Sequence, residues 1–348
     1  MKASVRAQDV ASLAGVSQSA VSRTFTPGAS VSEDTRRKVL AAAQQLGYRP
    51  NALARSLITR RSRIVALVMS YLENQFYPLV IERLSQQLQR EGYHVLMFIA
   101  DMDEAADGVL AEILEYQVDG IIMASTMLSP TLASSCAAVG VPVVQFNRIS
   151  SLEGSPRHTV SAVTSDNHRG GELAAMLLLE RGYRHIAFLA GLEASSTSIA
   201  RERGFAETLA AHGLGLTARE TGHYDFAEAQ AATRRLFRQP QQPDALFAAN
   251  DHMAIAALDV IRGELQLRVP GDVAVIGFDD VPQSSWGAYD LTSVRQDLES
   301  MVTATVSLMC EQMQGAFAPR NIVIPCELVE RSTVRPRIDH LPLTGASF

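Results

Sequence analysis

The spacing of hydrophobic residues along the chain changes near residue 64. Before this point, short segments carry apolar residues three and four positions apart, which is the spacing of one helix face. After it, short apolar runs alternate with longer amphipathic segments, which is typical of strands alternating with helices. The pattern therefore predicts a small all-helical part followed by a larger α/β part.

The first part contains two predicted short helices joined at Gly15. The first helix has an apolar face, and Ala11 on it is small enough for the second helix to cross close above. Gly15 permits the positive φ that a tight turn requires, and Ser17 can cap the second helix. An ordinary helical hairpin has the same pattern. The second helix, however, exposes side chains that hydrogen-bond base edges and phosphates in a major groove: Gln18, Ser19, Ser22 and Arg23.

Two further helices are predicted before residue 64. Ser32 is a candidate N-cap for a helix over 33–46, which ends at Gly47. Pro50 then changes the chain direction, and Asn51 can cap a helix over 52–57. Because that helix is too short to be stable by itself, we expect it to order only against a partner.

The second part contains two repeats of the strand–helix pattern. The first repeat has predicted strands over 64–69, 95–99, 119–123 and 141–146, with helices over 77–91, 104–117 and 130–138. The second has strands over 185–190, 245–248 and 273–277 and a short strand near Tyr224, with helices over 167–181, 198–212, 225–238 and 251–262. A helix over 298–314 and a strand over 321–324 return to the first repeat. Such short apolar runs indicate parallel strands covered on both faces, with ligand crevices at their carboxyl ends.

Charge is distributed unevenly along the chain. Its 348 residues carry a formal net charge of −6, which by itself argues against a nucleic-acid partner. Residues 1–63 nevertheless contain eleven basic and three acidic side chains, so a head of charge +8 precedes a remainder of −14. A basic head suits a protein that presents one end to a phosphate backbone, although a solvated basic terminus would have the same composition.

Composition restricts the other classes of function. With 47% hydrophobic and 20% charged residues, no signal-peptide pattern and no apolar run long enough to span a bilayer, we expect a globular protein without a membrane partner. Cys136, Cys310 and Cys326 show no metal-ligand spacing, so we expect reduced thiols in a cytoplasmic protein. Because the sequence has no glycine-rich phosphate loop, nucleophile elbow or histidine cluster, we expect no enzyme, cofactor or metal.

Residues 4–63 resemble the DNA-binding headpiece and hinge of the LacI/GalR (lactose-repressor/galactose-repressor) family of bacterial transcriptional regulators. The matching elements come in order: Asp9-Val10-Ala11, Ala14-Gly15-Val16-Ser17, Val21-Ser22-Arg23, Val31-Ser32, Thr35-Arg36, Leu46-Gly47-Tyr48, Pro50-Asn51 and Ala54-Arg55-Ser56-Leu57. The two repeats resemble the periplasmic sugar-binding fold that this family carries as its core. The resemblance implies a small all-α helix-turn-helix headpiece plus an α/β core of two doubly wound Rossmann-like subdomains, a periplasmic-binding-protein-like core of type I.

The resemblance also implies three crossings of the chain between the core subdomains, which we place near 162–164, 292–295 and 323–326. The expected division is a headpiece over 1–49, a hinge helix and linker over 50–63, an N-subdomain over 64–162 and 294–323, a C-subdomain over 163–293 and 324–335, and a tail over 336–348. The tail has no leucine heptads, so the tetramer-forming helix of the lactose repressor is not expected and a homodimer is.

A set of DNA contacts is implied by the positions that match the family's motifs. Gln18 and Ser19 occupy the places of the base-reading pair, and Arg23 that of a third reader. Leu57 occupies the place of the hinge leucine that wedges into the minor groove. Arg6 stands where a threonine is usual, which leaves the capping of the first helix open. Positioning or phosphate-contacting roles are implied for Arg6, Ser17, Ser22, Thr35, Asn51 and Ala54.

A second set of residues is implied for a small-molecule effector. Arg201 matches the arginine with which the family holds its ligand, and a guanidinium can form paired hydrogen bonds with adjacent ligand oxygens. Asn250 and Asp279 follow predicted strands and match ligand-facing positions. Their neighbours Asp251 and Asp280 have a simpler interpretation as helix caps. The further implied effector contacts are Phe76, Ser125, Asn147, Tyr224 and Gln296.

The sequence therefore predicts a sequence-specific DNA-binding transcriptional regulator, and we expect a repressor. Its partners would be double-stranded operator DNA, a second copy of the chain and a small-molecule effector. A sugar or sugar derivative is the first choice of effector, a nucleobase stays open, and an inducer and a corepressor would use the same parts. We expect a cytoplasmic bacterial protein that is nucleoid-associated when DNA-bound. The alternative is a solute-binding protein of a transport system, against which the basic head and the missing export signal argue.

Overall fold

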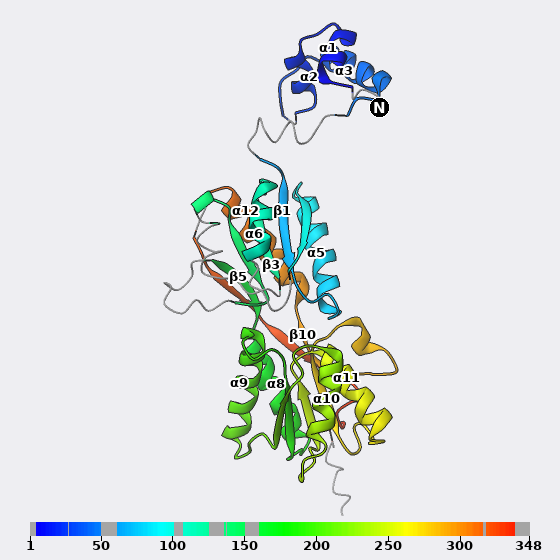
Figure 1. Ribbon diagram of the computed structural model, residues 1–348, viewed down its shortest axis with the longest axis vertical. Coiled ribbons are helices and arrows are strands. Elements are labelled where there is room, and N and C mark those ends of the chain that lie inside the picture. Colours follow the sequence, from blue (N-terminus) through cyan, green and yellow to red (C-terminus); the bar gives the residue numbers. More distant parts are fainter. Residues whose placement is uncertain are drawn as a thin grey trace, which may run out of the picture. The chain divides into compact units, whose positions relative to one another are not determined.

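Two compact units make up the chain, Met1–Ser62 and Arg63–Phe348, which we call the headpiece and the core (Figure 1). The computed structural model describes residues 5–26, 28–49, 61–100, 107–124, 136, 138–149, 160–315 and 318–337. The predicted helix over 52–57, most of the helix over 130–138 and most of the tail lie outside these residues.

Three helices pack around a small apolar centre in the headpiece. They are α1 (Ala7–Ala14), α2 (Gln18–Thr24) and α3 (Glu33–Leu46). Gly15 makes the turn between α1 and α2 with a φ of 66°. Ala11 and Val21 are buried against residues of α3, and Ser17 caps α2 by accepting a hydrogen bond from the backbone N–H of Ala20 at 3.2 Å. The two predicted helices, their glycine turn and the third helix are confirmed.

The core contains two six-stranded sheets, and the first of them defines the N-subdomain. Its strand order is β11-β5-β4-β3-β1-β2, and all neighbouring strands are parallel. The strands are β1 (Ile64–Met69), β2 (His94–Ile99), β3 (Gly120–Ala124), β4 (Val143–Phe146), β5 (Ser161–Ser165) and β11 (Asn321–Ile324). Its described helices are α5 (Phe76–Arg90), α6 (Asp107–Glu115) and α12 (Leu298–Met313).

Helices cover both faces of this sheet, because successive residues of a strand point to opposite sides. Leu67 of β1 belongs to an apolar cluster with Leu84 of α5 and Met309 of α12. Val68 belongs to a different cluster, which includes Ile113 of α6. Burial on both faces explains why β1 is an uninterrupted apolar run in the sequence.

The second sheet defines the C-subdomain and has the strand order β12-β10-β9-β8-β6-β7. Its strands are β6 (Ile186–Ala190), β7 (Ala218–Thr221), β8 (Ala245–Ala248), β9 (Ala274–Asp279), β10 (Thr292–Gln296) and β12 (Cys326–Val329). Its helices are α8 (Asn167–Glu180), α9 (Ser196–Ala211), α10 (Phe226–Leu236) and α11 (Asp251–Leu258), which continues as a π-helical segment over Asp259–Glu264. The pairs are parallel except for β10 and β12, which are antiparallel.

The chain crosses between the subdomains directly after β5, β10 and β11, at Asp166, Asp297 and Pro325. The first two crossings lie two residues beyond the expected ranges 162–164 and 292–295, and the third lies within the expected range 323–326. The first two were expected too early because β5 and β10 contain serines and threonines and lack the apolar run by which the other strands were recognised. At the first two crossings the aspartate caps the next helix, with Asp166 accepting from Arg169 N–H and Asp297 from Ser300 N–H.

One predicted strand is misplaced. The strand expected near Tyr224 is β7, which ends at Thr221, and Tyr224 lies in the following loop with a φ of 61°. Because β7 is a partly exposed edge strand, it has no apolar run to mark its position. The three cysteines are free, as expected. Among the described residues, no helix is long and apolar enough to cross a membrane.

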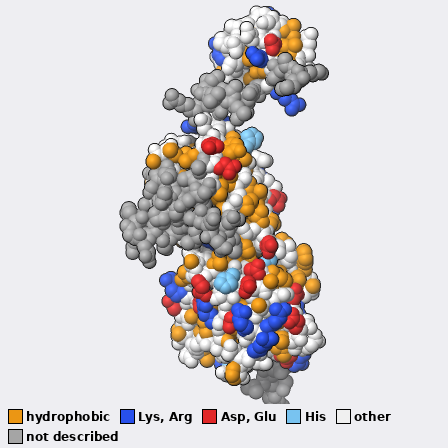
Figure 2. Space-filling model, in the orientation of Figure 1, with side chains coloured by type: hydrophobic (Ala, Val, Ile, Leu, Met, Phe, Trp, Pro, Cys, Tyr) orange, Lys and Arg blue, Asp and Glu red, His pale blue; other side chains and the backbone are white. Residues whose placement is uncertain are grey.

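Charged side chains of both signs are mixed on the C-subdomain, as the face drawn in Figure 2 shows. Arg219 pairs with Glu202 at 2.6 Å, and Arg234 pairs with Glu264 at 2.6 Å. Such pairs neutralise one another locally, so they give no concentrated positive field. The uneven charge of the sequence therefore matters mainly at the headpiece.

Candidate functional site

Helix α2 presents a polar face on the surface of the headpiece. Gln18, Ser19, Ser22 and Arg23 are all exposed, and residues three and four apart lie on one side of a helix. The Ser19 hydroxyl hydrogen-bonds the Ser17 hydroxyl at 2.9 Å, and Arg23 Nε donates to the Ser19 carbonyl at 3.4 Å. These local bonds orient the face and leave its side chains accessible to a groove.

The starts of α1 and α3 hold two more of the expected DNA contacts. Arg6 is the N-cap residue of α1, and its backbone N–H donates to Asp9 Oδ2 at 2.8 Å, the acidic half of a capping box. The exposed Arg6 side chain is thereby left for other contacts. Thr35 Oγ1 accepts from the Ser32 hydroxyl at 2.8 Å, and Ser32 caps α3. The remaining expected DNA contacts lie outside the described residues: Asn51, Ala54 and Leu57.

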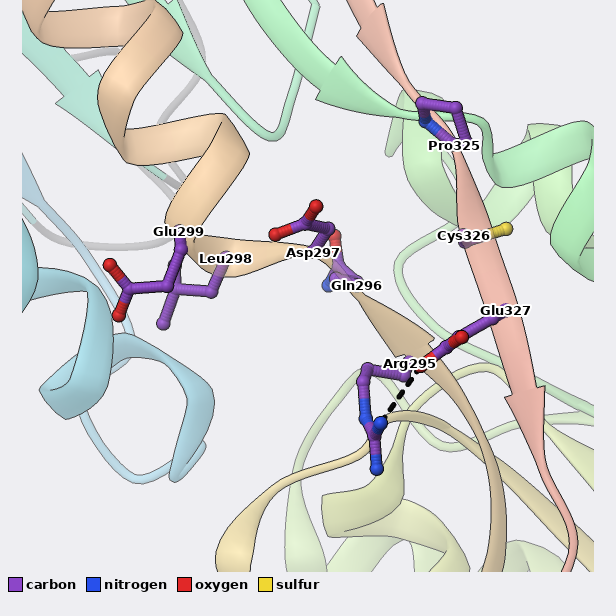
Figure 3. Close-up of a pocket in the computed structure, with 8 residues that line it drawn as sticks. All are labelled: Arg295, Gln296, Asp297, Leu298, Glu299, Pro325, Cys326 and Glu327. Atoms are coloured by element: carbon purple, nitrogen blue, oxygen red, sulfur yellow. Dashed lines mark hydrogen bonds and ion pairs between the residues drawn. The ribbon is translucent and has the colours of Figure 1, made fainter.

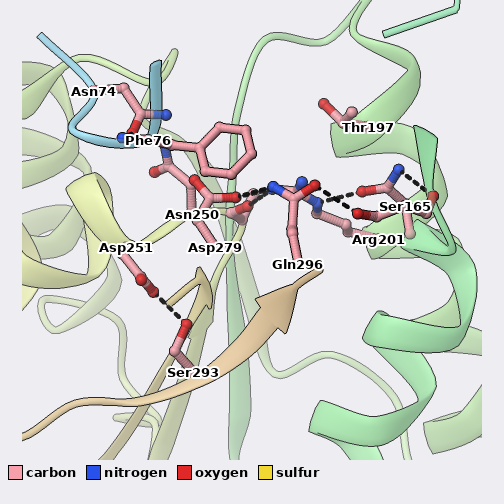
Figure 4. A network of polar contacts seen from close by, with 12 residues as sticks. Asn74, Phe76, Ser165, Thr197, Arg201, Asn250, Asp251, Asp279, Ser293 and Gln296 are labelled. Atoms are coloured by element: carbon pink, nitrogen blue, oxygen red, sulfur yellow. Dashed lines mark hydrogen bonds and ion pairs between the residues drawn. The ribbon is translucent and has the colours of Figure 1, made fainter. Parts of the chain in front are cut away.

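The carboxyl ends of the two sheets meet between the subdomains. Ser165, which ends β5, donates from its hydroxyl to Gln296 Oε1 at the end of β10 at 2.7 Å. The Ile149 N–H of the N-subdomain donates to Ser196 Oγ of the C-subdomain at 3.0 Å. We call the expected effector contacts in this region, none of which is more than 5% exposed, the junction site: Phe76, Asn147, Arg201, Tyr224, Asn250, Asp279 and Gln296. Figure 4 shows five of them, Phe76, Arg201, Asn250, Asp279 and Gln296. Ser125 lies outside the described residues.

Arg201 is the central cation of the junction site and is 2% exposed. Its Nε donates to Asn167 Oδ1 at 2.8 Å, and its Nη1 donates to the carbonyl of Ala249. The guanidinium carbon lies 3.5 Å from the centre of the Phe278 ring, which supplies a cation–π contact. These contacts hold the guanidinium plane in one orientation while using two of its five N–H groups.

Close packing of α9 against α8 places Arg201 of α9 near the carboxyl ends of the strands. A Cβ added to Gly171 of α8 would lie 2.1 Å from the Arg201 carbonyl oxygen. A Cβ added to Gly204 of α9 would lie 2.0 Å from the His168 carbonyl oxygen. Since no side chain fits at either position, the two glycines let the helix backbones touch and bring Arg201 to the strand ends.

Asp279 is the central carboxylate. Gln296 Nε2 donates to its Oδ1 at 2.6 Å, while Arg201 Nη1 stands 3.6 Å from the same oxygen. Burial raises the pKa of Asp279 to about 7 from its ordinary value of 3.8, although Arg201, Gln296 and Asn74 favour the ionised form. Desolvation therefore outweighs the nearby cation, and the carboxylate would gain from further hydrogen-bond donors.

Two amide atoms of the junction site are buried without a hydrogen-bond partner in the described structure: Asn147 Oδ1 and Asn250 Nδ2. The other end of the Asn250 amide caps α11, with Oδ1 accepting from Met253 N–H at 3.0 Å. Buried polar atoms normally have partners, and leaving one unpaired costs about 1–3 kcal/mol. An acceptor and a donor are thus available to a ligand.

Backbone strain marks the same place. Asn147, Tyr224 and Asp279 have φ values of 68°, 61° and 118°, which side chains other than glycine rarely adopt. Tyr71, just after β1, has a φ of 71°. Such conformations cost about 1–3 kcal/mol each and cluster where structure serves binding.

Sequence reasoning missed two aromatic residues that border the junction site. Tyr71 lies 6.5 Å from Tyr224 and 6.1 Å from His252, measured between ring centres. His252 Nδ1 is 3.3 Å from Gln75 Oε1, which links the two subdomains. Tyr71 Oη and His252 Nε2 are also buried without a described partner. The one sequence feature that could have identified Tyr71 and His252 is that each lies shortly after the carboxyl end of a strand, β1 and β8 respectively.

The helix-cap interpretation of Asp251 and Asp280 is wrong. Asn250 caps α11, whereas Asp251 is fully buried and accepts from the hydroxyls of Ser284 and Ser293. Asp280 pairs with Arg295 at 2.6 Å and with Arg331 at 2.7 Å. Both carboxylates therefore tie strand ends together.

A groove of about 510 Å³, which shares Gln296 with the junction site, lies at the second and third crossings (Figure 3). It is lined by Arg295, Gln296, Asp297, Leu298, Glu299, Pro325, Cys326 and Glu327. Its carboxylates already have partners, since Asp297 accepts from Ser300, Glu299 pairs with Arg83 and Glu327 pairs with Arg295. The junction site, by contrast, holds two buried amide atoms without a described partner, which makes it the stronger candidate for a binding site.

Comparison with known proteins covers both units. Residues 7–51 match the family model of bacterial regulatory proteins, lacI family, and residues 175–334 match that of the periplasmic binding protein-like domain. The HTH-type transcriptional regulator CelR of Thermobifida fusca is 33% identical over 93% of this chain and 96% of its own length. The chain belongs to the LacI family.

Other members of the LacI family agree with this assignment. The ribose operon repressor of Bacillus subtilis is 32% identical over 94% of this chain and 98% of its own. The solved lac repressor dimer, bound to operator and an anti-inducer, has a TM-score of 0.85 at 27% identity, covering 95% of this chain and 99% of that one. The complex of CelR with cellobiose has a TM-score of 0.71 at 31% identity, covering 94% and 99%.

Membership of the LacI family settles the broad questions left by the sequence. The chain is a DNA-binding transcriptional regulator and not an enzyme, and its fold is the expected helix-turn-helix headpiece with a periplasmic-binding-protein-like α/β core. The alternative of a transport protein is excluded, because the similarity to regulators extends over headpiece and core together.

Proposed function

We propose that this regulator is a homodimeric repressor whose affinity for its operator is controlled by a sugar bound in the junction site. The observation that carries the proposal is the convergence of buried, incompletely paired polar groups at the ends of β4, β8, β9 and β10. Buried groups of this kind gain most from a ligand that replaces their missing hydrogen bonds.

The chemistry of the site favours a neutral molecule rich in hydroxyls. Asp279 can accept from two hydroxyl groups, and Asn250 Nδ2 and Arg201 can donate to ligand oxygens. The rings of Phe76 and Tyr224 are buried at the same site and suit the apolar face of a sugar ring. Relatives support this choice, since one is a ribose operon repressor and CelR has been solved with cellobiose. Asn147, Gln296 and Ser125 complete the proposed contact set.

For the headpiece we propose that α2 reads base edges with Gln18, Ser19 and Arg23. Leu57 would wedge into the minor groove between the two copies of the dimer, where unstacking a base step costs a few kcal/mol. The lac repressor solved on its operator is a dimer, which supports this arrangement. The proposed phosphate-contacting or positioning residues are Arg6, Ser17, Ser22, Thr35, Asn51 and Ala54. The regulator would act in the bacterial cytoplasm on nucleoid DNA.

The link between the two units is conformational. The subdomains meet directly at the junction site, so a sugar can enter only when they separate, and it then favours one angle between them. A ligand changes operator affinity only if it binds the two conformations with different affinity. Whether the sugar acts as inducer or corepressor follows from which conformation holds DNA.

The sugar site is tested by titration calorimetry of the purified protein with cellobiose, ribose, sucrose and, as a second chemical class, guanine. Arg201→Ala should weaken binding of the retained ligand about 100-fold, because it removes charge-assisted hydrogen bonds. The control is Arg203→Ala on the same helix, whose side chain is 63% exposed. Equal affinity of the two variants would refute the site, and retention of guanine alone would refute the sugar.

The DNA-binding proposal is tested by selecting bound duplexes from a random pool at a stated salt concentration. We expect a two-fold symmetric site. Gln18→Ala should relax the base preference at one position in each half-site, by about 1–3 kcal/mol of discrimination. Leu57→Ala should weaken binding to every selected site, while Gln45→Ala, an exposed change on α3, should do neither. An asymmetric selected site would contradict the dimer.

A further inference from the structure

The segment that follows β9 is part of the C-subdomain, yet one of its side chains packs in the N-subdomain. Val281 is 1% exposed and belongs to the apolar cluster that contains Phe76 and Val80 of α5 and Val302 of α12. The first half of the core is therefore completed by a residue from the second half. Pro282 follows directly and starts a short 3₁₀ helix over Pro282–Ser285.

The same segment is clamped to the C-subdomain by Asp251. Its Oδ2 accepts from Val281 N–H at 2.9 Å and from the Ser284 hydroxyl at 2.7 Å. Its Oδ1 accepts from the Ser293 hydroxyl of β10 at 2.6 Å, as Figure 4 shows. A Cβ at Gly277 would lie 2.1 Å from Oδ1, so the carboxylate fits tightly against β9. Two of these buried hydrogen bonds thus fix the segment, at Val281 and at Ser284, and the third ties the same carboxylate to β10.

The clamp is adjacent to three residues of the junction site. Asp251 follows Asn250 in the chain, and Val281 comes two residues after Asp279. Strand β10, which the clamp also holds, ends at Gln296. One carboxylate therefore connects the residues after β8 and β9 with β10, and each of these three strands contributes a polar group to the junction site at its carboxyl end.

We propose that residues 279–285, clamped by Asp251, form a strut that couples sugar binding to the angle between the subdomains through Val281. This inference rests on the proposed sugar site. A clamped segment cannot follow the N-subdomain when the two subdomains separate, so opening withdraws Val281 from its apolar surroundings. Burial of that side chain favours the closed arrangement. Because Asp279 lies on the same segment, a ligand bound to Asp279 also favours the segment position that keeps Val281 buried.

The test compares two valine truncations in the same apolar cluster. Val281→Ala shortens the strut's own side chain, whereas Val306→Ala, at a position 2% exposed on α12, removes an equal volume from the same cluster at a residue outside the strut. Amide hydrogen exchange of the full chain is measured for all three proteins. We expect Val281→Ala to speed exchange about tenfold over residues 279–285 and 76–80, while Val306→Ala leaves residues 279–285 as in the wild type.

Sugar affinity is the second readout, with cellobiose as the probe. Val281→Ala should weaken cellobiose binding about tenfold, and Val306→Ala less than about twofold. Asp251→Asn should weaken it as well, and the double variant with Val281→Ala should lose less than the product of the two effects, because both changes release one segment.

The outcomes separate the strut from the sugar site. Unchanged exchange of residues 279–285 in Val281→Ala, or equal acceleration by Val306→Ala, would overturn the strut. If hydrogen exchange changes as expected but both valine variants bind cellobiose with equal affinity, the coupling to sugar binding is overturned and the segment has only a structural role. If the wild type does not bind cellobiose, the choice of sugar fails, and the exchange result alone decides whether the strut exists.

Discussion

Replacing Asp279 with asparagine should stabilise the unliganded protein at alkaline pH while removing a proposed ligand contact. Burial raises the pKa of this carboxyl from 3.8 to about 7, so the folded state holds its proton more tightly than the unfolded state. The stabilisation that results is complete below pH 3.8 and is lost as the pH rises through about 7.

The size of this loss follows from the two pKa values. At 1.36 kcal/mol for each pH unit, the difference corresponds to about 4 kcal/mol in total. About 3 kcal/mol of that is lost between pH 5 and pH 8. Asp279→Asn cannot ionise, so its advantage over the wild type in free energy of unfolding should grow by about 3 kcal/mol over this range. Asp251, whose pKa is raised to about 6, titrates in both proteins and largely cancels from the comparison.

Urea denaturation at several pH values measures this difference. The control is Asp272→Asn, because Arg268 holds the pKa of Asp272 at about 2 and its difference from the wild type should be flat between pH 5 and pH 8. The opposite expectation is that Arg201, left without its carboxylate, makes the variant less stable at every pH. A difference that is constant or that falls with rising pH would refute the reasoning from desolvation.

Two further changes test the packing that positions the sites. Gly171→Ala should lower the free energy of unfolding by about 1–3 kcal/mol and weaken sugar binding, because its Cβ would force α9 and Arg201 away; unchanged sugar affinity would show that Arg201 tolerates the shift. Ser17→Ala should destabilise the headpiece by about 1 kcal/mol, measured by thermal unfolding, and weaken operator binding. Ser30→Ala, outside the described helices, is its control and should change neither quantity.

Most elements could be predicted because their burial leaves a record in the sequence. Strands such as β1 are covered on both faces and so consist of apolar residues throughout, and helix ends are marked by glycines with positive φ, such as Gly15 and Gly47. Strands β5, β10 and β12 escaped because they contain polar residues or are half exposed. Near the crossings, the strands carry polar residues because their ends contribute to the junction site, so they lack the apolar run that would mark them as strands.

The positions of the junction residues could also be predicted, since parallel strands deliver their carboxyl ends to one edge. The partners of these residues could not. Ser284 and Ser293 lie 33 and 42 residues after Asp251, and no spacing rule connects them with it. The contact of Gly171 with Arg201 depends on how two helices cross, which the local pattern of either helix does not encode.

Two properties of predicted junction residues that only the structure reveals have the same effect on stability: the raised pKa of Asp279 and the unpaired amide nitrogen of Asn250. An ionised Asp279 and an unpaired Asn250 amide make the closed arrangement less stable than its apolar contacts alone would. A ligand that supplies donors and acceptors there removes these costs only where the subdomains are closed, whereas in the open arrangement water already satisfies the same groups. The costs of the unliganded site are therefore the source of the difference in affinity between the two arrangements, without which no ligand could control operator binding. By this reasoning the burial of Val281 has to stabilise the closed arrangement, but by less free energy than ligand binding supplies, so that the ligand determines which arrangement is populated.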